Sequence, residues 1–545
     1  MKSGFMNFDR LSWVSLTAAM LVQTTGAAAP RKTPGVDPAS AARTRPNILV
    51  ILADDMGYSD PGCYGGELST PALDRLADEG MRLTQFRNCG MSVCSRLSLL
   101  TGKWWPQAEK HFSQTPLLSE RLHEVGYKTA LIGKWHLPGN PMDRGFDHFF
   151  GFLGGFSNHF VGSSDYRIDN EPYDQFGEGY YSADAFSERA VEFIRQATSE
   201  DGGAPFFIYL SYQTPHNPLH APYEDVMRNR GKYLQGWQKI HDERIRRQKE
   251  MGVLPKNVEV PSYPQNLPVW ESLSSQQQDL EDLRMSVYAA MVERMDRGIA
   301  KVLDALDACG VADQTIVLFV SDNGADPFSN TDDAMLRAGK LPGDTMSNWQ
   351  LGTGWAYASV TPWRLYKISQ HGGGITSGAI VRYPGVIKKE GDLCHTAVHF
   401  VDVAPTLAHI AGCKTDEEEN GESFLPLLEG KSWTREKPMF FQFVDNRAVR
   451  TGKWSLVEVD GAGWQLFDVR KDPLECSNLA DRYPEVVARL EEMWRQWWHD
   501  QTGQSEYQPI STQNHQHYAP QGDWGSGKLY VPRAMPEHLK HRYEK

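Results

Sequence analysis

Buried strand patterns and helical patterns alternate along most of this chain. Four apolar runs have strand length and read as strands covered on both faces. They are residues 46–53, 127–133, 205–212 and 315–321. Helical periodicity with cap or stop residues marks residues 70–80, 117–125, 183–196, 285–309 and 401–412. Strands that alternate with helices imply βαβ units, so we predict an α/β fold with a large mixed, mostly parallel sheet sandwiched by helices.

The pattern changes after residue 435. Short strand signals separated by turn residues cover residues 439–444, 454–459 and 464–469, and a helix pattern covers 483–498. They predict a small antiparallel sheet packed on a helix. We therefore divide the chain into a main domain at 30–435, a small α+β subdomain at 436–500 and an irregular tail at 501–545.

The first 29 residues read as a secretory signal peptide. Lys2 and Arg10 precede an apolar run at residues 11–22, and small residues follow, with cleavage expected near Ala28 or Ala29. The run is too short to span about 30 Å of hydrocarbon, so we expect export to the periplasm or the medium and no membrane span after cleavage.

The formal net charge of −13 limits the partners of this chain. A protein that is acidic overall has no general basic field for nucleic acid phosphates, so we expect no nucleic acid partner. An anionic substrate would need a local cluster of cations. A binding site for an anion is therefore expected where cations gather.

Polar residues follow each of the four buried strand patterns. They are Asp54 and Asp55 after the first, Lys134 and His136 after the second, His216 after the third, and Asp322 and Asn323 after the fourth. In open parallel sheets, ligands bind beyond the carboxyl ends of the strands. We therefore expect these side chains to meet, although they lie far apart in the sequence.

The residue types in this set suit a hard cation beside an anion. Asp54, Asp55, Asp322 and Asn323 offer oxygen ligands, which favour calcium over zinc. Cations and donors are supplied by Arg96, Lys103, Lys134, His136, His216, Lys367 and His371. A nucleophile near a cation, with Lys and His aimed at oxygens that gain charge, is the arrangement needed to transfer a sulfuryl or phosphoryl group.

Residues 91–102, Met-Ser-Val-Cys-Ser-Arg-Leu-Ser-Leu-Leu-Thr-Gly, supply a candidate nucleophile. This stretch resembles the activation motif of the type I sulfatases, in which a Cys or Ser precedes an Arg by four residues and a Leu-Thr-Gly run follows. The alignment places Ser92 where the family's maturation enzyme forms formylglycine. Cys94 is the alternative, but Arg96 is then only two residues away and the spacing fails.

Further blocks look like sulfatase blocks in family order. They are residues 45–57, 132–136, 214–216, 320–324 and 365–367. Residues 223–272 read as a polar surface excursion that contains a charged helix at 240–251. The part at 231–270 is similar to the insert of bacterial arylsulfatases, the closest subgroup. The resemblance implies an alkaline-phosphatase-like fold and a main domain that is catalytic.

The resemblance also implies roles for the site residues. One calcium ion would be held by Asp54, Asp55, Asp322, Asn323 and residue 92, which is Ser92 before its oxidation. Arg96 would orient the formylglycine, and His136 would activate its hydrate. The sulfate oxygens would be bound by Lys134, His216 and Lys367, with His371 beside them.

In the family mechanism, a hydroxyl of the aldehyde hydrate attacks sulfur and displaces the alcohol, and loss of a proton from the other hydroxyl expels sulfate. The implied substrate is an aryl or carbohydrate sulfate, and the implied partner is a serine-type maturation enzyme.

Two departures from the family pattern leave alternatives open. Gly372 stands where the family usually has Glu, and residues 102–117 look shortened. A phosphatase or phosphonate hydrolase of the same superfamily would use Ser92 unmodified. An inactive protein that binds sulfated glycans, in which Cys94 blocks maturation, would also keep Ser92 intact.

Overall fold

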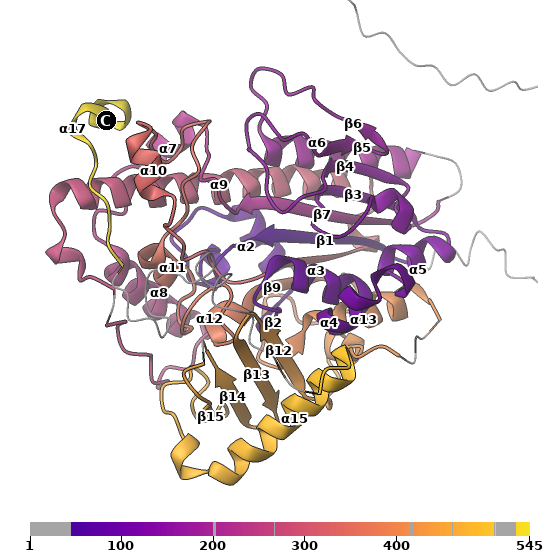
Figure 1. Cartoon of the computed structure of the whole chain (residues 1–545). Helices are drawn as coiled ribbons and strands as arrows, with labels where there is room; N and C mark the ends of the chain where they lie inside the picture. Colours follow the sequence, from indigo (N-terminus) through magenta and orange to yellow (C-terminus); the bar gives the residue numbers. More distant parts are fainter. Residues whose placement is uncertain are drawn as a thin grey trace, which may run out of the picture.

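The computed structural model describes residues 45–199, 203–265, 267–414, 416, 418–459, 461–505, 507 and 530–544. The predicted signal peptide at 1–29 lies outside the described residues, as does most of the tail after residue 507. Figure 1 shows the large sheet with helices on both faces and the small sheet below it. None of the helices in the described ranges combines the length and apolar character that a membrane span requires.

The centre of the large sheet is parallel, as predicted. Its neighbouring strands are, in order, β8 (Thr315–Ser321), β1 (Asn47–Asp54), β7 (Phe206–Pro215), β3 (Lys128–Lys134) and β4 (His148–Phe152). On one side β9 (Thr376–Arg382) runs antiparallel between β8 and β2 (Met81–Arg87). The edges are completed by β10 (Asp392–Cys394), β11 (Val398–His399), β5 (Tyr166–Ile168) and β6 (Glu171–Pro172). The sheet is therefore mixed and mostly parallel.

Strand β1 is buried on both faces because its side chains enter two different cores. Ile48, Val50 and Leu52 join one core, and the residues between them join the other. One layer of helices comprises α2 (Pro71–Asp78), α6 (Ser182–Ser199) and α9 (Ser275–Ala308). The opposite layer comprises α3 (Ser92–Thr101), α4 (Trp105–Lys110), α5 (Leu118–Glu124), α13 (Val403–Ala411) and α14 (Leu425–Leu428).

Helix α9 begins ten residues before the predicted start at residue 285. A capping box fixes its N-terminus: the hydroxyl of Ser274 accepts from the Gln277 amide, and the Gln277 side chain accepts from the Ser274 amide. The first turn is polar, so the apolar periodicity does not reveal it.

The subdomain has one more strand than predicted. Its sheet runs in the order β12 (Met439–Phe443), β13 (Asn446–Thr451), β14 (Trp454–Glu458) and β15 (Gln465–Asp468), all antiparallel. Helix α15 (Pro484–Thr502) lies along this sheet (Figure 1). An apolar seam, which contains Trp104, Ile375 and Val401 of the main domain, joins the subdomain core around Trp494.

The prediction of a surface excursion after residue 223 is wrong. The segment forms α7 (Tyr223–Asn229) and α8 (Trp237–Met251), and α8 buries Trp237 and Arg244 completely. The Arg244 guanidinium pairs with Asp60 at 2.7 Å and with Glu67 at 2.8 Å. These ion pairs make burial of a charged helix face possible.

The last described residues fold back onto α9. The Tyr530 hydroxyl donates to Glu281 at 3.0 Å, and the Met535 amide donates to the Gln276 carbonyl at 2.8 Å. A short helix, α17 (Glu537–Lys540), follows and lies far from α15 in Figure 1. The remaining helices are α10 (Asp332–Arg337), α11 (Thr353–Ser359) and α12 (Gly372–Ile375).

Candidate active site

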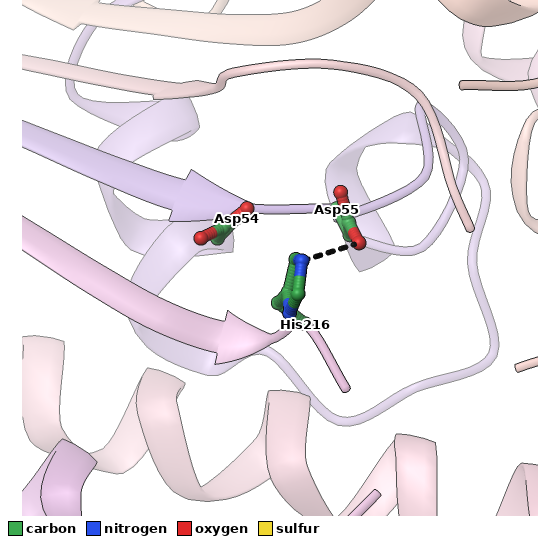
Figure 2. A group of neighbouring side chains, drawn as sticks. All are labelled: Asp54, Asp55 and His216. Atoms are coloured by element: carbon green, nitrogen blue, oxygen red, sulfur yellow. Dashed lines mark ion pairs between the residues drawn. The ribbon is translucent and has the colours of Figure 1, made fainter. Parts of the chain in front are cut away.

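The polar residues that follow the central strands lie together at one edge of the sheet. Parallel β1 and β7 bring Asp54, Asp55 and His216 into one group, whose ligand atoms all lie within 4.8 Å of one another. Figure 2 shows the His216 ring pointing at Asp55, with 3.6 Å between Nε2 and Oδ2. The predicted convergence of strand ends is therefore present.

Ser92 is the first residue of α3, and its hydroxyl contacts two side chains that lie beside this group. One turn later, Arg96 Nε donates to Ser92 Oγ at 3.0 Å, and His136 Nδ1 lies 3.2 Å from the same oxygen. Cys94 is fully buried, and burial, with the neighbouring Cys89, raises the pKa of its thiol well above the usual range. Of the two candidates in the motif, only Ser92 has described contacts with the site.

The Arg96 guanidinium connects α3 to three strand ends. Its Nη1 donates to the Lys134 carbonyl at 3.1 Å and to the Ser211 hydroxyl, and its Nη2 lies 3.2 Å from Asp322 Oδ2 and 3.5 Å from Asp54 Oδ2. The side chain is fully buried. This geometry needs a planar fork of donors, and a lysine side chain has no such fork.

Two lysines face the paired aspartates. Lys134 Nζ donates to Asp54 Oδ2, and Lys367 Nζ lies 2.7 Å from Asp55 Oδ1 and 2.9 Å from Asp55 Oδ2. Lys367 comes from the loop before α12, so this contact joins that loop to the end of β1. Both ammonium groups lie beside the carboxylates, where an anion held next to a metal would also meet them.

The oxygen atoms of this site suit a hard cation. Asp54 Oδ1 and Asn323 Oδ1 are buried and have no hydrogen-bond partner among the described residues. Nearby, the Asn323 side-chain amide donates to Asp55 Oδ1, and the Asp55 amide donates to Asp322 Oδ1 at 3.3 Å. Carboxylate and amide oxygens are the ligands that calcium takes in proteins, so the residues present fit this ion.

Burial and mutual charge shift the titration of the cluster. Burial and the neighbouring Asp54 raise the pKa of Asp322 to about 6. Burial, opposed by Asp55, lowers the pKa of His216 to about 3, and burial together with the Lys134 charge lowers the pKa of His136 well below its usual range. Both imidazoles are therefore neutral near pH 7.

Two predicted cationic residues have their described contacts elsewhere. His371 Nδ1 lies 2.8 Å from Glu475 Oε2 of the subdomain, and Lys103 Nζ lies 3.0 Å from Glu418 Oε2. The structure therefore does not join either side chain to the Asp54–Asp55 cluster.

Glu475 also bears on the departure at Gly372. Glu475 Oε2 accepts from the Gly372 amide at 3.2 Å. A Cβ on Gly372 would lie 2.5 Å from the Trp363 ring, so a glutamate could not stand there without displacing it. A carboxylate from the subdomain thus lies beside the position where the family usually carries one.

Two site residues, Ser211 and Asp326, and the subdomain residue Glu475 were missed from the sequence. Ser211 lies inside the third strand pattern and bonds to Arg96, and Asp326 lies four residues after Asp322 with its Oδ2 buried and unpartnered among the described residues. Burial and the Asp55 charge raise the pKa of Asp326 to about 7. Its place after the fourth strand was an available signal, whereas Glu475 offers none because it lies 104 residues from His371.

Comparison with known proteins identifies the family. The family model for sulfatases matches residues 46–413, which is more than half of the chain. The chain belongs to the sulfatase family. A second model, for the C-terminal part of N-sulphoglucosamine sulphohydrolase, matches residues 370–500 and so begins inside the main domain of this sulfatase. As a sulfatase, the protein is a sulfuric ester hydrolase.

Similar proteins cover most of this sulfatase. An arylsulfatase of Klebsiella aerogenes is 32% identical, over 71% of this chain and 91% of its own, and an uncharacterised sulfatase of Schizosaccharomyces pombe is 31% identical, over 83% and 93%. A crystal structure of Ps i-CgsB in complex with k-i-k-neocarrahexaose has a TM-score of 0.62 at 23% identity, over 91% of this chain and 99% of that one. A structure solved in complex with its substrate D-glucosamine-2-N,6-O-disulfate has a TM-score of 0.60 at 22% identity, over 84% and 98%. These likenesses agree with the observed fold.

Proposed function

We propose that this sulfatase hydrolyses an aryl or carbohydrate sulfate ester, with a formylglycine formed from Ser92 and one bound calcium ion. The observation that carries the proposal is the position of Ser92 Oγ, between Arg96 Nε at 3.0 Å and His136 Nδ1 at 3.2 Å. A nucleophile held between a cation and a neutral imidazole has both charge stabilisation and a proton acceptor within reach.

The substrate class is supported by the relatives. The Klebsiella relative is named an arylsulfatase, and two proteins of the same fold were solved with a neocarrahexaose and with a disulfated glucosamine. A sulfated small molecule or glycan is therefore the substrate that we assign to this chain.

Each residue around Ser92 has a separate part in the proposed reaction. Oxidation of Ser92 would supply an aldehyde hydrate as nucleophile, in place of the hydroxyl. Arg96 holds position 92 and counters negative charge there, and His136 accepts the proton at Nδ1. Lys134, Lys367 and His216 lie where they can bind sulfate oxygens as these gain charge. The substrate role of His371 stays a prediction, because its described contacts lead to Glu475.

Calcium would be held by oxygens of Asp54, Asp55, Asp322 and Asn323, together with position 92. Bound there, it would polarise a sulfate oxygen and increase the positive charge of the site. The buried, unpartnered oxygens of Asp54 and Asn323 support this assignment.

We further propose that the protein is exported to the periplasm or the medium and that a serine-type maturation enzyme converts Ser92. The charged start, the short apolar run at residues 11–22 and the small residues after it support export.

Mass spectrometry of the peptide that contains Ser92 tests the proposal, using protein expressed together with a serine-type maturation enzyme. We expect loss of two hydrogens at Ser92, reaction with a hydrazine reagent and turnover of an aryl sulfate. Cys94→Ser should keep the modification and the activity, and Ser92→Ala should lose both. Intact Ser92 with phosphatase turnover would favour the phosphatase alternative, and intact Ser92 with glycan binding but no turnover would favour the binding protein.

A further inference from the structure

A second concave site lies between the main domain and the subdomain. Its cavity has a volume of about 440 Å³ and is bounded by Arg87 at the end of β2, by residues 395–397 and 434–437, and by the β13–β14 turn. No residue of the Asp54–Asp55 cluster lines it. The volume lies within the range of pockets that bind small molecules, roughly 300 to 1,000 Å³.

Cations dominate the wall of this pocket, although the whole chain carries a net charge of −13. The lining includes five arginine or lysine side chains, and Glu436 is the only carboxylate in it. The five cations are Arg87, Arg435, Lys437, Arg450 and Arg470. Such a wall selects a negatively charged ligand.

Neighbouring carboxylates neutralise only part of this charge. Arg435 lies 3.1 Å from Asp402 and 3.5 Å from Glu422, so its charge is matched. At the rim, the exposed Lys437 and Arg470 form no ion pair with the described carboxylates. The pocket therefore keeps an excess of positive charge.

Two buried guanidiniums line the pocket, and among the described residues only Arg450 pairs with a carboxylate. Arg450 Nη2 donates to Glu475, whereas the hydrogen-bond acceptors of Arg87 are the neutral side chains of Gln85 and Thr376. Arg450 Nε is buried and has no hydrogen-bond partner among the described residues. Arg450 as a whole is 8% exposed and lines the pocket. An unpaired buried donor is unfavourable, and an anion that reached it would satisfy it.

The pKa of Arg87 is consistent with an excess of positive charge in the pocket. Burial first, and then the neighbouring Arg450 charge, lower the pKa of Arg87 well below its usual range. Two like charges held together in a buried place are stabilised by an anion between or beside them.

We propose that this pocket binds a sulfated saccharide unit of a polyanionic glycan, at a site separate from the catalytic cluster. The cavity is larger than a single oxyanion requires, and the partly exposed Trp454 lines it beside the cations. Guanidiniums bind sulfate oxygens with paired donors. The proposal does not rest on conversion of Ser92, because binding here involves none of the catalytic residues.

The test compares two double variants of the full chain by calorimetric titration with a heparin-derived octasaccharide at 0.15 M salt. Lys437→Glu with Arg470→Glu reverses two rim charges of the pocket. We expect its affinity for the octasaccharide to fall at least about tenfold, because two attractions become repulsions. The matched control is Arg195→Glu with Lys239→Glu, exposed cations of α6 and α8 that do not line the pocket. We expect the control to lose no more than about twofold.

Equal losses in both double variants would overturn the proposal, since the effect would then be one of net charge. Displacement of the octasaccharide by inorganic sulfate at the same concentration of sulfate groups would also overturn it, because the pocket would then be a site for small anions. Thermal unfolding midpoints of the two double variants within about 2 °C of each other show that both are folded. Binding is measured whether or not Ser92 is oxidised, so failure here is distinct from failure of the proposed catalysis.

Discussion

At the scale of single residues, Arg96 does most to organise the site. Its donors contact Ser92 Oγ, the Lys134 carbonyl and Asp322, so one side chain ties the start of α3 to two strand ends. The resemblance of residues 91–102 to the sulfatase activation motif predicted that Arg96 acts on position 92. It could not predict Ser211, because a serine inside an apolar strand has no pattern of its own.

Arg96→Lys tests this role. Lysine keeps the charge but cannot direct donors in three directions, so we expect kcat/KM for an aryl sulfate to fall about 100-fold or more. Arg246→Lys, on the exposed face of α8, is the control and should leave kcat/KM unchanged. A loss of less than about fivefold in Arg96→Lys would mean that charge alone accounts for its role.

At the scale of elements, the site depends on a loop and a short helix, α12, that touch through their backbones. A Cβ on Gly324, just after β8, would lie 1.8 Å from the Gly373 carbonyl oxygen, and the Gly324 amide donates to the Gly374 carbonyl at 3.0 Å. The absence of a side chain at Gly324 lets the loop before α12 bring Lys367 within 2.7 Å of Asp55.

Gly324→Ala should push α12 away from the loop that follows β8. We expect the Lys367 ammonium to move away from Asp55 and kcat/KM to fall about 100-fold, since a displacement of about 1 Å can cost that much. Gly177→Ala is a matched control, because no atom lies within 4 Å of a Cβ built there. Steady-state rates on an aryl sulfate measure both, and equal rates would show that the loops can yield without loss.

The central strands and most helices were predictable because burial on both faces leaves long apolar runs and clear stops. β13 was missed because its two arginines interrupt the apolar pattern, and one of them, Arg450, pairs with Glu475 in a distant loop. The burial of α8 was missed for a similar reason. Its Arg244 is paired with Asp60, which is 184 residues away, and no local pattern records that contact.

At the scale of the whole molecule, the last described residues are held on α9 through a titratable contact. Glu281 is fully buried, accepts from the Tyr530 hydroxyl and lies 3.3 Å from Arg284 Nε. Burial raises the pKa of Glu281 to about 7, from an ordinary value of 4.5. The native state therefore binds a proton between these two pH values, where the unfolded chain does not.

Because of this difference in proton binding, the free energy of unfolding should depend on pH in a defined direction. The contribution of Glu281 is largest below pH 4.5 and is lost as the pH rises through about 7, because the buried group must then ionise. We expect the free energy of unfolding of Glu281→Gln, relative to the wild type, to rise by the order of 3 kcal/mol between pH 4.5 and pH 8. Urea unfolding over this range measures it. Glu492→Gln, on the exposed face of α15, should show no such trend, and a flat difference for Glu281→Gln would refute the prediction.

The apolar seam between the main domain and the subdomain decides where the chain can be divided. Trp104, Ile375 and Val401 belong to the main domain but are buried in the core formed by β12–β15 and α15. A fragment cut near residue 435 would expose these side chains to water and would leave His371 without Glu475. The change of composition near residue 435 is therefore not a boundary between parts that fold separately. A fragment of this sulfatase made for catalysis has to extend through the end of α15.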